Sequence, residues 1–190
     1  SLLHTPGHVK HDGHNLTGFI IFLCSESIIF FAFFVGYGVL KISAPTWYPD
    51  GVSGIAVREP LINTVVLVSS SFVIYFAERY LHKKNYWGFR IVWLITMLMG
   101  SYFVYGQYVE WSELTFSLSS GVFGSLFYLL TGFHGLHVIT GILLMGLMLF
   151  RSFIPGNYEK GEMGVESISL FWHFVDVIWI ILFVLIYVWQ

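Results

Sequence analysis

The sequence is poor in charged residues and in cysteine, and each shortage excludes a class of protein. Only 11% of its 190 residues are Asp, Glu, Lys or Arg, whereas a soluble domain carries about a quarter. The formal net charge of -2 offers nucleic acid no basic surface. A single cysteine, Cys24, excludes an internal disulfide and any site built from several thiolates of this chain, such as a dinuclear copper centre or an iron–sulfur cluster.

Apolar and aromatic residues are correspondingly abundant. Hydrophobic residue types make up 56% of the chain and aromatic residues 19%, and the mean hydropathy is +0.75. Composition of this kind predicts a membrane protein. The opening segment, SLLHTPGHVKHDGHN, lacks the apolar core of a cleavable signal peptide. We therefore expect the first long apolar segment to remain as a membrane anchor.

Five apolar stretches reach the length of about 20 residues that a helix needs to cross a bilayer. The connections between them are short, and those at 44–51 and 154–157 carry turn-forming residues. The sequence thus predicts an all-α, polytopic membrane bundle without a second domain, preceded by a His-rich tail at 1–15. The single bundle at 16–190 contains the expected spans, which are about 16–40, 61–81, 89–111, 121–150 and 167–189.

The distribution of lysine and arginine predicts how the bundle is oriented. Lys41 and Arg58 fall on one side of the predicted spans. The other cationic residues fall on the opposite side; they are Lys10, Arg79, Lys83, Lys84, Arg90, Arg151 and Lys160. Because cytoplasmic loops are enriched in Lys and Arg, the N-terminus is expected inside. After an odd number of spans, the C-terminus is expected outside.

Several ionisable residues lie within the apolar spans. Such residues are costly in a bilayer, so they usually face the bundle interior and suggest a functional role. His134, His137 and Gly141 follow a spacing of three and four residues, which places them on one helix stripe where the glycine lets a neighbouring helix approach. The remaining deep candidates are Glu26, His173 and Asp176. Glu110 is expected in a solvated loop at the outer end of the third span.

Three interpretations of these residues remain open. In the first, they form a buried hydrogen-bond network that determines how the helices pack, and each acid is protonated or bonded to an imidazole. In the second, Glu26 is a carboxyl group that exchanges protons. In the third, the histidines bind haem or a metal ion. His134 and His137 resemble a chelating pair, but on one face of one helix they cannot supply both axial ligands of a haem.

The N-terminal tail carries histidines at nearly helical spacing. They could bind a transition metal or collect protons. The segment TPGHVKHDGHN also contains a proline and two glycines, which favour a mobile, solvated tail instead. The histidines concerned are His4, His8, His11 and His14.

Four segments resemble one protein family. They are FLCSESIIFFAFF at 22–34, GQYVEW at 106–111, SSGVFGSLFYLLTGFHGLHVITG at 119–141 and FWHFVDVIWIILFVLIYVW at 171–189. Together they resemble subunit III of the haem–copper respiratory oxidases, the cytochrome c oxidase subunit 3 family. The resemblance extends over nearly the whole chain. It places Glu26 at the family's carbodiimide-reactive buried glutamate and Glu110 at its acidic position near a helix end.

The resemblance implies an all-helical bundle without redox centres. Such a subunit lies beside the catalytic subunit I, which holds the haems and copper. The resemblance implies that the accessory subunit supports proton uptake and protects the active site of subunit I during turnover. The implied partners are subunits I and II, with a small subunit IV as a further candidate, together with structural phospholipid. The longer relatives carry two further helices before the one that matches 22–34. In those relatives the two helices frame a lipid-filled cleft. Here we expect that lipid or another subunit forms the outer wall of the cleft, or that this wall is missing.

Alternatives within and outside this family remain. Cytochrome c is the expected electron donor of the complex, and quinol is the alternative. A stand-alone membrane cytochrome would use His134, His137 and His173 as haem ligands. A purely structural, lipid-binding subunit would leave Glu26 without proton exchange. The expected location is a bacterial inner membrane, with a thylakoid or mitochondrial inner membrane as alternatives.

Overall fold

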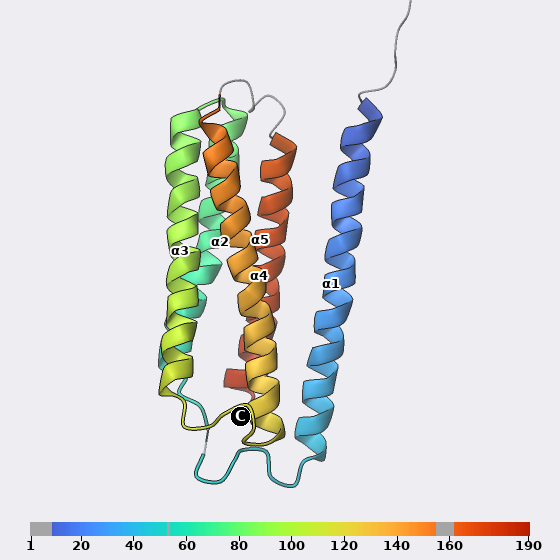
Figure 1. The fold of residues 1–190 in the computed structure, drawn as a ribbon, viewed down its shortest axis with the longest axis vertical. Coiled ribbons are helices and arrows are strands. Elements are labelled where there is room, and N and C mark those ends of the chain that lie inside the picture. The colour runs from blue at the N-terminus through green and yellow to red at the C-terminus, as the bar shows by residue number, and fades with distance from the viewer. Residues whose placement is uncertain (1–8, 53, 155–161) are drawn as a thin grey trace, which may run out of the picture.

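The computed structural model describes residues 9–52, 54–154 and 162–190, and in this part of the chain all regular structure is helical. The last helix changes to a short π-helix, η1, near its end (Figure 1). The helices are α1 Val9–Ser43, α2 Arg58–His82, α3 Tyr86–Glu113, α4 Val122–Ser152, α5 Glu162–Phe183 and η1 Val184–Val188.

The predicted all-α membrane bundle is confirmed. Five helices are long and apolar enough to cross a membrane. Each end of a predicted span lies within three residues of the corresponding helix end, and most of the helices extend further into the connections than predicted. The spanning parts are Leu16–Ser43, Arg58–His82, Tyr86–Glu113, Val122–Ser152 and Gly164–Val188.

The boundary between tail and bundle differs from the expectation. α1 begins at Val9, so residues 9–15 of the His-rich tail predicted at 1–15 are helical and continue into the first span. A glycine inside a helix costs only about 1 kcal/mol relative to alanine, so Gly13 does not stop a helix that the following apolar run sustains. The only proline of the segment, Pro6, precedes the helix. His4 and His8 lie outside the described residues.

Tight turns set the antiparallel order of the helices. Lys84 adopts a left-handed backbone conformation with φ 60° between α2 and α3. The side chain of Asn85 then accepts a hydrogen bond from the Gly88 amide at 3.1 Å, which caps the start of α3. α4 follows Gly121, whose φ of 132° disfavours other residues. The short connection between His82 and Tyr86 makes α2 and α3 direct neighbours.

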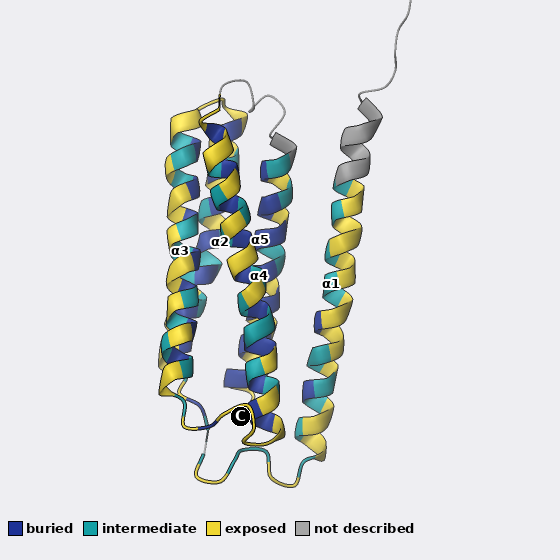
Figure 2. Cartoon of the chain, viewed as in Figure 1, coloured by how far each residue is buried: buried dark blue, intermediate teal, exposed yellow. Residues whose placement is uncertain are grey.

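The helices differ strongly in how far they are buried. In its most apolar stretch α5 is 56% buried inside the molecule, whereas α1 is only 6% buried. α1 stands beside the other four helices and contacts α4 and α5 (Figures 1 and 2). Therefore α5 forms the centre of the bundle, and α1 leaves most of its apolar surface to lipid or to another polypeptide.

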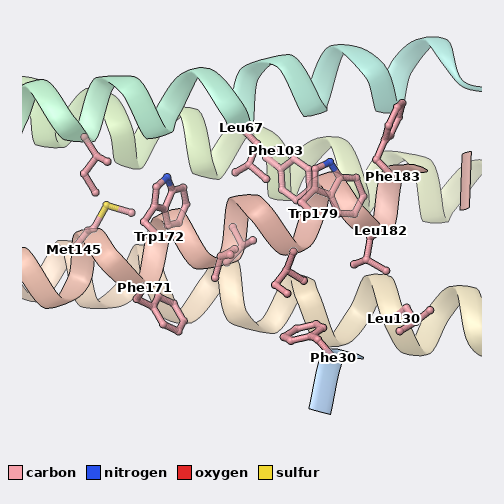
Figure 3. Close-up of a cluster of buried hydrophobic side chains, with 14 of the residues drawn as sticks. Phe30, Leu67, Phe103, Leu130, Met145, Phe171, Trp172, Trp179, Leu182 and Phe183 are labelled. Carbon is pink, nitrogen blue, oxygen red and sulfur yellow. The ribbon is translucent and has the colours of Figure 1, made fainter. Parts of the chain in front are cut away.

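Trp172 on α5 joins three other helices. A Cβ atom placed on Gly100 of α3 would lie 2.5 Å from its ring, and one on Gly141 of α4 would lie 2.9 Å away. The indole N–H donates to Ser70 Oγ on α2 at 2.8 Å. Figure 3 shows Trp172 and Trp179 extending from α5 toward α2. The prediction that Gly141 allows close approach of a neighbouring helix is thus confirmed.

Candidate functional site

Glu26 and His137 form a polar contact between α1 and α4. Glu26 Oε2 lies 3.0 Å from His137 Nε2, and the two side chains are 18% and 12% exposed. The other ring nitrogen, Nδ1, lies 2.8 Å from the carbonyl oxygen of Phe133. The most conspicuous acid of the first span therefore has a specific partner on another helix.

The hydrogen bonds of His137 restrict the protons of this pair. A carbonyl oxygen can only accept, so Nδ1 must carry a proton and donate to Phe133. The contact between Nε2 and Glu26 then needs one more proton, which belongs either to the carboxyl group or to the ring. The pair is a neutral acid with an imidazole, or a carboxylate with an imidazolium. Chemically, it can hold one proton and move it over a single hydrogen bond.

Aromatic rings surround the pair. The His137 ring lies 4.7 Å from that of Phe133 and 5.1 Å from that of Phe30, both edge to face. The Phe171 ring stacks on it at 6.2 Å. These rings come from α1, α4 and α5, so the pair lies where three helices meet. Apolar walls strengthen the electrostatic interaction between the two groups because they exclude water.

His134 makes a different contact although it lies only three residues before His137. Its ring is fully buried, and Nε2 donates to the carbonyl oxygen of Val175 on α5 at 3.0 Å. The rings of Phe103 and Trp179 pack against it at 5.8 and 5.0 Å. Because the carbonyl is an acceptor, a neutral ring with its proton on Nε2 satisfies this bond. His134 thus links α4 to α5, whereas His137 links α4 to α1.

Asp176 and His173 take part in separate contacts. Asp176 is buried on α5, and its Oδ2 accepts a hydrogen bond from Ser71 on α2. Its Oδ1 has no partner among the described residues. The Nε2 atom of His173 lies 3.4 Å from Ser169 Oγ, one turn earlier on α5. The predicted residues therefore do not form one cluster: Asp176 links α5 to α2, whereas the His173 contact lies within α5.

The expectation that Glu110 lies in a solvated loop is wrong. Glu110 is only 9% exposed. Its Oε1 accepts from the hydroxyl group of Tyr187 at 2.5 Å, and its Oε2 accepts from Gln107 Nε2 at 3.3 Å. The π-helix η1 contains Tyr187 and ends the chain's last span against α3. A residue near the end of a helix is therefore not necessarily exposed to solvent, because a neighbouring helix can cover its side chain.

Several contributing residues were not identified from the sequence. Gln107 lies three residues before Glu110 on the same helix, a spacing that could have indicated their contact. Ser71 and Tyr187 gave no such signal, because their partners lie on distant spans. No group of three or more His, Cys, Asp or Glu side chains that could hold a metal ion occurs in the described ranges.

The fold and the polar contacts define a polytopic helical membrane protein whose intramembrane acids and imidazoles form hydrogen bonds with one another, with neighbouring helices or, for His173, within their own helix. Residues 4–190 match the family Cytochrome c oxidase subunit III. The chain belongs to this family, which confirms the resemblance found in its motifs.

The chain is similar to individual members from distant organisms. It is 40% identical over 189 residues to cytochrome c oxidase subunit 3 of Synechocystis sp., covering 97% of this chain and 81% of the relative. It is 42% identical over 180 residues to that of Thermostichus vulcanus, covering 94% and 89%. Identity to the protein of Oryctolagus cuniculus is 38% over 179 residues, covering 90% and 68%.

Proposed function

We propose that this chain is subunit III of a proton-pumping haem–copper terminal oxidase in an aerobic respiratory chain. In this role it has no redox centre of its own, binds beside the catalytic subunit I, stabilises it and supports proton uptake. Subunits I and II are its proposed partners, with a small subunit IV as a further one. The observation that carries the proposal is the family match over residues 4–190.

The Glu26–His137 pair is the proposed proton-handling group. It holds one proton in a single hydrogen bond, and α1 has little contact with the rest of the bundle. A protonated pair beside subunit I would act as a local proton reserve near an uptake channel. Glu110, His134, His173 and Asp176 are proposed as buried polar groups that support the packing of the helices around it.

Cytochrome c is the proposed electron donor of the complex. The relatives from cyanobacteria and from eukaryotes are named as cytochrome c oxidase subunits, which favours this donor over quinol. The donor binds elsewhere in such a complex, so the partner subunit II decides the question. Thiolate copper ligands in that subunit would support cytochrome c, and their absence would support quinol.

A stand-alone haem protein is less well supported. The Nε2 atom of His134 is already bonded to a backbone carbonyl inside a fully buried site, and that of His137 is bonded to Glu26. Haem would have to displace both partners. The discriminating measurement is a reduced-minus-oxidised spectrum of the isolated chain: bound haem would overturn the proposed accessory role.

Phospholipid is proposed to fill a groove between α1 and α5. The groove has a volume of about 440 Å³ and is apolar almost throughout. Its apolar lining suits acyl chains, which pack against apolar side chains. The lining residues are Ser27, Ile28, Phe31, Phe34, Phe174, Val177, Ile178 and Ile181.

The proposed location is a bacterial inner membrane, with a thylakoid or mitochondrial inner membrane as the alternative. The proposed orientation has the N-terminus inside. In a Cys24→Ser background, Lys84→Cys should be protected from a membrane-impermeant thiol reagent in intact cells, and Asp50→Cys should react. The reverse pattern would contradict this orientation.

Co-purification tests the function most directly. An affinity tag on this chain should retain a haem-containing complex, identified by mass spectrometry of its subunits and by its visible spectrum. Purification of the chain free of haem-bearing partners, under conditions that preserve other membrane complexes, would contradict the proposal.

A further inference from the structure

One buried amide group on α2 has no hydrogen-bond partner among the described residues. Asn63 is only 6% exposed, yet its side chain forms no hydrogen bond with any of them. The next residue, Thr64, accepts from the indole N–H of Trp179 at 2.8 Å. A buried polar group without a partner costs about 1–3 kcal/mol. The unpaired amide of Asn63 therefore indicates a place where a ligand can supply the missing hydrogen bonds.

Close packing against α3 holds this amide in place. A Cβ atom on Gly106 would lie 2.5 Å from Oδ1 of Asn63 and closer still to Nδ2. Only a glycine at position 106 leaves room for the amide, because α2 and α3 lie side by side here (Figure 1). A side chain that is already fixed loses little entropy when it binds a ligand.

Asn63 and Gly106 lie in a groove between α2 and α3. Asn63 is five residues from the start of α2, about 8 Å along the helix, so the groove lies within the membrane-spanning part. Its walls include Tyr102 and Tyr105, which are largely exposed and whose hydroxyl groups have no partner among the described residues. The remaining lining is mainly apolar, with Pro60, Ile62 and Val109.

The size of the groove indicates what kind of group fits it. Its volume is about 280 Å³, whereas one water molecule occupies about 30 Å³. Pockets for whole small molecules measure about 300–1,000 Å³. The groove therefore suits a single ring with its substituents, and an attached apolar tail would remain outside in the bilayer.

The charges around the groove exclude an anionic ligand. Two acids, Glu59 and Glu110, contribute to the lining, and the described residues that line it include no lysine, arginine or histidine. These carboxyl groups disfavour phosphate or carboxylate groups. The ligand should thus be neutral and flat enough to pack against tyrosine rings. It should also carry oxygen atoms that can bond both to an amide and to a phenol hydroxyl group.

We propose that Asn63, Tyr102, Tyr105 and Gly106 bind the ring of an isoprenoid quinone or of its quinol. We call these four residues the Asn63 site. The amide N–H of Asn63 donates to a quinone carbonyl oxygen, and its amide oxygen accepts from a quinol hydroxyl group, so one side chain serves both forms. The inference concerns binding and not the electron donor of a complex. It requires only a membrane that contains quinone, so it does not depend on the proposed function.

Photoaffinity labelling tests where the ligand binds. The complex that contains this chain is purified in detergent and treated with an azido derivative of a short-chain benzoquinone, and the labelled peptides are identified by mass spectrometry. We expect the label on α2 near Asn63 or on α3 near Tyr102 and Tyr105, and an excess of decylubiquinone should prevent it. Labelling confined to other helices or to other subunits would overturn the proposal.

Substitutions test which groups recognise the ring. Asn63→Leu removes the amide at similar volume and should weaken decylubiquinone binding, measured by competition with the label, about tenfold. Tyr105→Phe should weaken it severalfold. Tyr108→Phe is the matched control, because Tyr108 is exposed on the same helix but does not line the groove. Equal affinities in Tyr105→Phe and Tyr108→Phe would contradict the proposal, and this comparison decides if Asn63→Leu does not assemble.

Stability separates a binding role of Asn63 from a structural one. Replacing an unpaired buried amide by an apolar side chain should leave the thermal unfolding temperature of the ligand-free complex unchanged or raise it. A lower unfolding temperature in Asn63→Leu would show that the amide already has a partner, and the argument for the site would then fail.

Competing ligands test the chemistry of the ring. Decylbenzene has the same tail without the ring oxygens and should compete far more weakly than decylubiquinone. Equal competition by decylbenzene would identify a groove for apolar chains, and equal competition by phosphatidylethanolamine would identify a phospholipid groove; either result would overturn the proposal. Competition under oxidising and under reducing conditions assigns the site to the quinone or to the quinol, and competition under neither condition would refute both.

Discussion

The pair of Glu26 and His137 shows how a single residue acquires its role from a partner on another helix. Glu26 alone is an acid in an apolar segment, which is costly. Its bond to His137, whose other nitrogen must donate to Phe133, defines where the extra proton can reside. A structural role and a proton-exchanging role therefore share the same hydrogen bond, and only substitution separates them.

Replacing Glu26 by Gln tests this pair. The amide can still donate to His137 Nε2, so the hydrogen bond survives with a loss of about 1 kcal/mol or less, while the exchangeable carboxyl proton disappears. We expect an assembled complex with full oxygen reduction and modestly slower proton uptake, measured with a pH-sensitive dye in vesicles. Glu113→Gln, at an exposed position, is the control. Complete loss of oxygen reduction in an intact complex would contradict an accessory role.

Tyr187 provides a second test at this scale. Tyr187→Phe keeps the ring but leaves the buried Glu110 with only the longer bond from Gln107. We expect the free energy of unfolding to fall by about 1–3 kcal/mol, as is usual for a buried group that loses its partner. Thermal unfolding in detergent measures this change. Tyr108→Phe on the exposed face of α3 should have no measurable effect, and an equal loss there would refute the argument.

Sequence reasoning identified these residues more reliably than their surroundings. Glu26, His134 and His137 are conspicuous because charged or polar groups are rare in apolar runs. Their partners depend on which helices lie next to each other, and hydropathy contains no such information. Glu110 was placed in solvent because its own segment ends there, although Tyr187 from the last span covers it.

At the scale of elements, α5 organises the bundle through polar links to α2. The indole N–H groups of Trp172 and Trp179 donate to Ser70 and Thr64, both at 2.8 Å. Asp176 lies between the two tryptophans in the sequence and accepts from Ser71. Three consecutive turns of α5 thus bind α2 at two places, Thr64 and the neighbouring pair Ser70 and Ser71. In an apolar environment such bonds, together with close packing, hold helices together.

Glycine substitutions in α4 should separate packing from helix propensity. A Cβ on Gly141 would lie 2.9 Å from Trp172, whereas one on Gly135 would meet nothing within 4 Å. We expect Gly141→Ala to lower the free energy of unfolding by about 1–3 kcal/mol, and Gly135→Ala to raise it by up to about 1 kcal/mol. Thermal unfolding in detergent compares them. If Gly141→Ala raised the free energy of unfolding as Gly135→Ala is expected to do, Trp172 would have to move aside, which would contradict the packing argument.

At the scale of the whole molecule, the bundle is incomplete as an isolated object. Large apolar side chains are exposed on every side, and α1 in particular contacts the other helices over a small part of its surface. Exposed apolar surface of this kind faces lipid or another membrane protein. The family to which the chain belongs is consistent with assembly into a larger complex.

Removal of the chain from the complex tests its role as a whole. Because the proposed function includes stabilisation and proton uptake but no redox chemistry, haem content per subunit I should remain unchanged. The number of turnovers before inactivation should fall severalfold, measured as oxygen consumption over time. Re-addition of the chain should restore the lifetime. Haem loss in proportion to removal of the chain would argue for a redox role instead.

The sequence by itself determined the class of the protein, its five membrane-spanning helices, its family and the identity of its intramembrane acids and imidazoles. These properties depend on local composition and on the length of apolar runs, which are read along one dimension. The tertiary structure alone decided that His137 turns to Glu26 while His134 turns to Val175, and that Glu110 is covered by Tyr187. The physical reason is that partners across helices depend on the rotation and register of each helix, which the packing of glycines and large rings determines.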